Sequence, residues 1–102
     1  MAKYLVMWES DMSRASANPK EQMERETKHV EMTKQAMKEG QVKDWGVFVG
    51  GHGGYALCEG SGIDMLKGVM PFYPYLKFNV QEVLTLDELS EVMKSMAELM
   101  KS

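Results

Sequence analysis

The segment Tyr4-Leu5-Val6-Met7-Trp8 constrains the fold of this chain more than any other. It is a short apolar run between polar neighbours, which predicts a β-strand rather than the start of a helix. Side chains alternate along a strand, so Tyr4, Val6 and Trp8 share one face. Leu5 and Met7 share the other. Both faces are apolar, and we therefore expect these residues to form a core or dimer strand, central in a sheet that is covered above and below.

Strand and helix patterns alternate along the rest of the chain. Further strands are predicted at 41–49, 55–59 and 75–84, and helices at 19–39, from 62 to the prolines near 71, and from 86 onward. Each helix start carries a capping residue followed three residues later by a carboxylate, and the pairs are Asn18 with Glu21, Ser61 with Asp64, and Thr85 with Glu88. Gly40 is expected to end the first helix. The glycines at 50–54 predict a hairpin, since they lead into a strand and not into the helix that a phosphate loop requires.

The order of these elements predicts one domain over residues 1–102 with an α+β fold. Two split strand-helix-strand units with right-handed crossovers give a four-stranded antiparallel sheet, the ferredoxin-like βαββαβ arrangement, here followed by a C-terminal helix. Both crossover helices then lie on one face of the sheet. The other face stays open although the first strand is apolar on that side too. We expect a second copy to pack its sheet against it, which makes a homodimer.

The helices are predicted to be amphipathic. Met23, Thr27, Val30 and Met37 form a narrow apolar stripe on the first helix, and His29 is expected to face outward. The terminal helix has a wider stripe, made of Leu86, Leu89, Val92, Met93, Met96, Leu99 and Met100. We interpret its methionines as packing residues and not as a soft-metal site.

Composition excludes several classes of function. With 12 Lys and Arg against 15 Asp and Glu, the net charge is -3, which offers no basic surface for nucleic acid or an anionic membrane. The N-terminal segment has no apolar signal core, so a cytoplasmic location is expected. Cys58, the one cysteine, has no internal disulfide partner and is interpreted as a small buried residue.

Two segments carry a family resemblance. The runs Gly54-Tyr55-Ala56-Leu57-Cys58-Glu59-Gly60 and Phe78-Asn79-Val80-Gln81-Glu82-Val83-Leu84, with the acidic pair Asp87-Glu88, resemble small domains of the dimeric α/β-barrel superfamily. In particular, they are similar to uncharacterised single-domain relatives of muconolactone isomerases and antibiotic-biosynthesis monooxygenases. The resemblance extends from Lys3 to about Glu88. It implies a homodimer that binds a small organic molecule between sheet and helices, with cofactor-independent isomerisation or oxidation as possible activities.

Several residues are candidates for such a site. His52 and Glu59 could transfer protons, whereas an exposed turn residue and a solvated strand end are the plainer interpretations. Trp8, Trp45, Tyr55 and Tyr73 could line a pocket for a flat ligand. None of these residues matches a catalytic set of the resembled family residue by residue.

Two classes of function remain open. The first is a small-molecule binding protein or enzyme, and the second is a non-catalytic interaction or regulatory dimerisation module. No metal site and no other cofactor are predicted, since His29, His52 and Cys58 do not form a zinc-type cluster in the sequence. An RNA-recognition domain shares the element order, but beyond Tyr55 the third strand lacks the aromatic and basic residues that bind bases.

Overall fold

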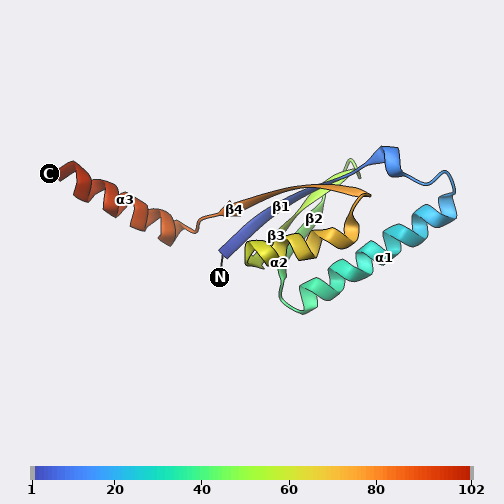
Figure 1. The fold of residues 1–102 in the computed structure, drawn as a ribbon, viewed down its shortest axis with the longest axis horizontal. Helices are drawn as coiled ribbons and strands as arrows, with labels where there is room; N and C mark the ends of the chain where they lie inside the picture. Colours follow the sequence, from blue (N-terminus) through green and yellow to red (C-terminus); the bar gives the residue numbers. More distant parts are fainter. Residues whose placement is uncertain (1, 102) are drawn as a thin grey trace.

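A single sheet with helices on one side dominates the computed structural model, which describes residues 2–101 (Figure 1). In chain order the elements are β1 (Ala2–Ser10), the 3-10 turn η1 (Met12–Arg14), α1 (Pro19–Lys38), β2 (Val42–Val47), β3 (Gly53–Gly60), α2 (Gly62–Val69), the 3-10 turn η2 (Met70–Phe72), β4 (Leu76–Val83) and α3 (Leu86–Lys101). Each predicted strand and helix is present.

The strands are ordered β2-β3-β1-β4, and every neighbouring pair is antiparallel. β1 and β3 are therefore the central strands, and α1 and α2 both cover the same face (Figure 1). This confirms the predicted ferredoxin-like α+β fold with a C-terminal helix. We call the sheet face away from α1 and α2 the open face.

The register of β1 explains where the core lies. Val6 is directly opposite Ala56 on β3, and Tyr4 is opposite Cys58, so these side chains share the helix-covered face. Val6, Ala56, Cys58 and Met65 of α2 form the buried cluster. Burial raises the pKa of the Cys58 thiol, which agrees with its interpretation as a core residue. Leu5 and Met7 point to the open face, where Met7 is 36% exposed.

The predicted caps are mostly confirmed. The side chains of Ser61 and Thr85 accept hydrogen bonds from the backbone N–H groups of Asp64 and Glu88, both at 3.1 Å. In return, each carboxylate accepts a hydrogen bond from the backbone N–H of its capping residue. Asn18 also caps α1, accepting from the Lys20 N–H at 2.9 Å. These bonds satisfy backbone donors that a helix start leaves unpaired.

Two local predictions were wrong in detail. Glu21 does not close a capping box with Asn18, because its carboxylate accepts from the Ser16 hydroxyl at 2.9 Å. β3 begins at Gly53, two residues earlier than predicted, because Gly53 and Gly54 pair with Glu9 and Trp8 of β1. Gly54 lies opposite Trp8, and the indole of Trp8 occupies the space that a side chain at Gly54 would need.

The orientation of α1 also differs from the prediction. Met23, Val30 and Met37 are exposed, by 63%, 47% and 43%. The half-buried residues of α1 are mostly polar, namely Gln22, Arg25, His29, Met32, Thr33 and Ala36. His29 therefore does not face outward, since its ring packs edge-on against Phe72 at 4.9 Å. Flat polar groups can pack on aromatic rings, and hydrophobic periodicity alone misses such contacts.

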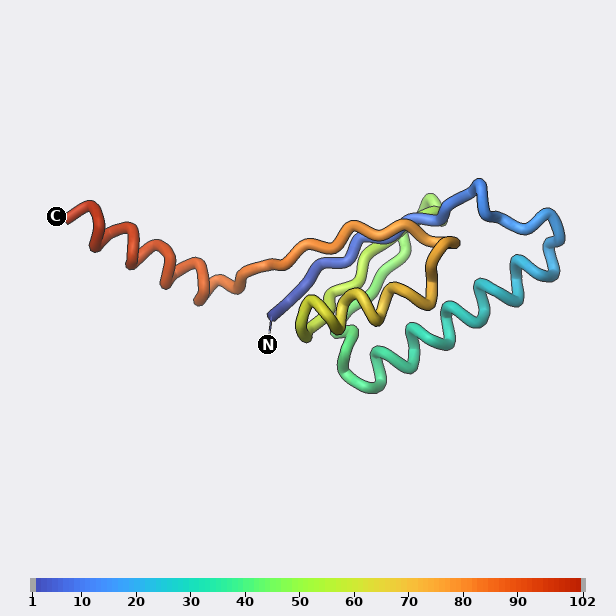
Figure 2. The backbone as a smooth tube through the Cα atoms, in the orientation of Figure 1, coloured from blue at the N-terminus to red at the C-terminus, as the bar shows by residue number. Residues whose placement is uncertain are grey.

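α3 extends away from the sheet beyond the end of β4 (Figures 1 and 2). The chain is accordingly elongated, 66 Å by 27 Å by 24 Å. Within residues 2–101, no helix is both long enough and apolar enough to cross a membrane.

The close approach of Trp8 to Gly54 gives a first prediction. Gly54→Ala places a methyl group against the Trp8 ring and the Gly46 carbonyl oxygen, which should destabilise the protein by about 1–3 kcal/mol. Gly68→Ala, in α2 with nothing within 4 Å, is the matched control and should stabilise by roughly 0.5–1 kcal/mol. Thermal unfolding followed by circular dichroism measures both. Equal melting temperatures for the two variants would contradict the packing described here.

Candidate functional site

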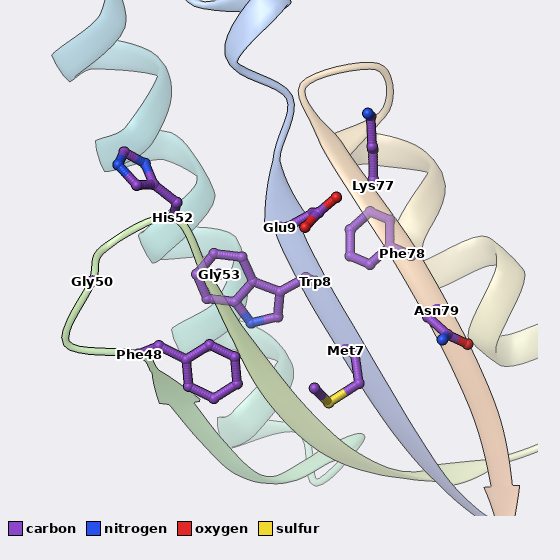
Figure 3. A pocket seen from close by; sticks show the side chains of 10 residues that line it. All are labelled: Met7, Trp8, Glu9, Phe48, Gly50, His52, Gly53, Lys77, Phe78 and Asn79. Atoms are coloured by element: carbon purple, nitrogen blue, oxygen red, sulfur yellow. The ribbon is translucent and has the colours of Figure 1, made fainter.

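A broad hollow of about 560 Å³ lies at the end of the sheet next to the β2–β3 hairpin (Figure 3). It is lined by Met7, Trp8, Glu9, Phe48, Gly50, His52, Gly53, Lys77, Phe78 and Asn79. Its volume is within the range of about 300–1,000 Å³ that is common for small-molecule sites. We call it the hairpin hollow.

Strand pairing places these residues together. Glu9 is the register partner of Lys77, and Met7 is the partner of Asn79, so β1 and β4 bring four side chains to one end of the sheet. The hairpin is fixed to β1 by the Ser10 N–H, which donates to the His52 carbonyl at 2.7 Å. His52 is thereby held beside the end of β1.

The lining combines apolar area with a few polar groups. Met7 and Phe48 present apolar surface, and Phe48 is 50% exposed. Lys77 contributes a cation, Glu9 an anion, and His52 an imidazole (Figure 3). Such a mixture suits a ligand with a flat apolar body and one polar or charged end.

Trp8 links the hollow to the sheet interior. Its ring stacks on Trp45 with centroids 5.6 Å apart and planes 15° from parallel. Its indole N–H is buried and has no acceptor among the residues that the structure describes. A buried donor without a partner costs roughly 1–3 kcal/mol, so an acceptor that reached it would be bound favourably.

The predicted site residues separate into two groups. Trp8 and His52 line the hairpin hollow, and Trp45 packs directly behind Trp8. Tyr55 and Glu59 lie outside the lining and have other partners. The Tyr55 hydroxyl donates to Asp44 at 2.8 Å, and Glu59 lies 3.7 Å from the Lys43 ammonium.

Tyr73, the remaining candidate, lies apart from this group. It follows η2, is 70% exposed, and precedes a cis peptide bond to Pro74. Tyr73 is not part of the lining of the hairpin hollow.

Sequence reasoning missed Glu9, Phe48, Lys77, Phe78 and Asn79. Four of these five belong to β1 and β4, and only the register between those strands brings them together. The alternating pattern of β4 was visible, but alternation does not fix which residue of β1 each side chain meets. Phe48 could have been found as an aromatic residue next to the glycine-rich hairpin.

A smaller hollow of about 200 Å³ lies between the start of α1 and the strand ends, which is closer to the expected position between sheet and helices. Arg25, His29 and Tyr75 contribute to its lining, and His52 borders it as well as the hairpin hollow. The Arg25 guanidinium lies 3.8 Å from the centre of the Tyr75 ring. The two histidines, distant in sequence, thus border one hollow.

These groups do not form a metal centre. No set of three or more His, Cys, Asp or Glu side chains suited to a metal ion occurs within residues 2–101. The pKa of His29 is lowered, mainly by burial and also by the positive charge of Arg25. The folded protein therefore favours the neutral imidazole.

Comparison with known protein families decides the classification. The model of a domain of unknown function, DUF3303, matches residues 2–97. The chain belongs to this family. No curated protein matches the chain. The match extends from β1 into α3.

The lowered pKa of His29 predicts a pH dependence of stability in this DUF3303 protein. A histidine with a lowered folded pKa stabilises the fold fully above its unfolded pKa of about 6.5, and this contribution is lost as pH falls below that value toward the folded pKa. The unfolding free energy should therefore decrease between about pH 7.5 and 5.5, and His29→Gln should flatten that dependence. Urea unfolding at several pH values measures it. His52→Gln, at the exposed turn, is the control, and an equal flattening there would contradict the assignment.

Proposed function

We propose that this protein acts as a homodimer that binds a small organic molecule in the hairpin hollow. The observation that carries the proposal is the hollow itself, where apolar surface from Met7 and Phe48 lies beside the polar groups of Lys77, Glu9 and His52. It is open toward the face that the dimer is proposed to cover.

The surface area of the chain supports a dimer. One chain exposes 7825 Å², whereas a compact monomer of 11.6 kDa exposes about 5,800 Å². The radius of gyration is 17.7 Å, against about 13 Å for a compact domain of this length. The excess is roughly 2,000 Å² per chain, or about 4,000 Å² for two chains, which is within the range that obligate dimer interfaces bury.

The open face supplies a suitable contact surface. Leu5 and Leu57 are register partners at its centre, and both are half-buried within one chain. Two such faces pack around a two-fold axis with interdigitated side chains, about 10 Å apart. Packing of the open face against a second copy would cover the face of β1 that α1 and α2 leave exposed.

The lining indicates the class of ligand. A flat aromatic or apolar ring would lie against Met7 and Phe48. A carboxylate or carbonyl on that ring would accept a hydrogen bond from Lys77. A small aromatic acid meets both requirements.

The hollow also has groups for proton transfer. His52 contributes an imidazole, and Glu9 adds a carboxylate to the same lining. Together they would allow an isomerisation of the kind that the resemblance to muconolactone isomerases implies, and the resemblance to monooxygenases implies cofactor-independent oxidation as the other reaction class.

A non-catalytic interaction module is the second candidate function. The observation that favours it is the apolar surface exposed outside the hollow, on the stripes of α1 and α3. In that case the chain would associate in the same way but bind no small molecule.

If the protein is the proposed dimer, substitutions at two neighbouring residues of β1 should have different outcomes. Leu5→Glu places a charge on the open face, and we expect a folded monomer with dimer affinity reduced at least about tenfold. Val6→Glu places the charge in the buried cluster, and we expect unfolding. Light scattering after size exclusion, with circular dichroism, separates the two. Met12→Glu, on an exposed turn, is the control. A wild-type protein that is already monomeric would contradict the proposal.

Ligand binding can be tested with 2-naphthoate, an aromatic carboxylate. In a Trp45→Phe background its binding should quench Trp8 fluorescence, and Phe48→Ala should weaken binding about tenfold or more. Tyr73→Ala truncates another exposed aromatic residue, outside the hollow, and should leave the affinity unchanged. Native mass spectrometry of the purified protein would identify any co-purified molecule. Equal affinities of the two variants would contradict the site, and a dimer without any bound compound would favour the interaction module.

A further inference from the structure

α3 and the β2–β3 hairpin lie at opposite ends of the same sheet. β4 begins at Leu76, opposite Ser10, whose N–H bonds to the hairpin residue His52. It runs to Val83, opposite Lys3, at the far end of β1. α3 then continues away from the sheet (Figures 1 and 2). A strand of this length spans about 25 Å, so α3 begins that far from the hairpin of its own chain.

α3 presents a wide apolar stripe to solvent. Leu86, Leu89, Val92, Met93, Met96 and Met100 are each exposed by 45% to 84%. Their spacing of three and four residues places them on one helix face. A helix of this length is marginal in water without packing of that face. The stripe therefore needs a partner surface.

The hairpin tip is a second exposed apolar surface. Val47, Phe48 and Val49 are consecutive, and their exposed fractions are 52%, 50% and 107%. Three consecutive exposed apolar residues are unusual unless they contact something. Phe48 also lines the hairpin hollow, so whatever covers the tip also borders that hollow.

Two-fold symmetry brings these two surfaces together. When two open faces pack with the axis perpendicular to the strands, the strands of the partner run in the opposite direction. The hairpin end of each chain then lies beside the α3 end of the other. α3 is about 24 Å long, which is enough to cross the end of the partner sheet.

We propose that α3 of each chain packs its apolar stripe on the hairpin tip of a second copy and so closes that copy's hairpin hollow. The proposal rests on the sheet-to-sheet dimer proposed above. It adds the relative orientation of the two sheets and the packing of each α3 on the other chain. The occupant of the tip is α3 of the second copy, because α3 of the same chain begins at the other end of the sheet. Each binding site is then built from both chains.

Hydrogen exchange of the full-length protein, read at the α3 backbone amides, tests the proposal. At concentrations where the protein is dimeric, α3 should exchange slowly, and dilution to the monomer should accelerate exchange about tenfold or more. Val49→Glu on the tip and Met96→Glu on α3 should each remove this protection. Two control variants add the same charge elsewhere and should keep the exchange protection of α3. They are Gln41→Glu, just before β2, and Ser95→Glu, on the polar side of α3.

Other outcomes overturn the proposal in distinguishable ways. If α3 is protected equally at all dilutions and in Val49→Glu, it packs on its own chain. If the protein is a dimer that binds 2-naphthoate while α3 exchanges freely, the exchanged helix is refuted and the proposed function stands. A monomer at all concentrations refutes both. Circular dichroism confirms that each variant is folded, and Val49 is already fully exposed, so its replacement should not disturb the core.

Discussion

The fold depends on a central strand that is apolar on both sides while the chain covers only one of them. α1 and α2 bury Val6 and its neighbours on β3, whereas Leu5 and Met7 stay on the open face. The buried cluster is small for a chain of this length, and the accessible surface is correspondingly large. The hydrophobic effect acts on that exposed area as it does on the core, and it favours association of two open faces.

Much of the fold follows from local sequence patterns. The alternation in Tyr4–Trp8 predicted both faces of β1, and the residue pairs at Ser61 and Thr85 predicted two helix starts with their hydrogen bonds. These features could be predicted because neighbours in the chain determine them. The ferredoxin-like order then followed from the right-handed crossover rule.

Other features depend on contacts between distant segments. α1 turns His29 and Arg25 toward the aromatic residues near β4 and leaves Met23 exposed, which reverses the face expected from its hydrophobic pattern. The candidate site was only partly predicted, since Trp8 and His52 line the hairpin hollow but Lys77 joins them through strand register. A one-residue shift in pairing would move every such side chain to the other face of the sheet. The sequence of one strand does not specify its register with the next.

Association of two chains would link the apolar open face to the proposed binding of a small molecule. The hairpin hollow is broad and open in one chain, and small-molecule sites bind through enclosure as well as through contact. A second copy would supply that enclosure. DUF3303 membership fixes the family.

Sedimentation equilibrium of the unmodified protein over a range of dilutions tests the central claim most directly. The account predicts a mass of twice 11.6 kDa that falls to the monomer value only on dilution. A mass of 11.6 kDa at every concentration would show that a single chain tolerates an uncovered apolar sheet face, and would contradict the account.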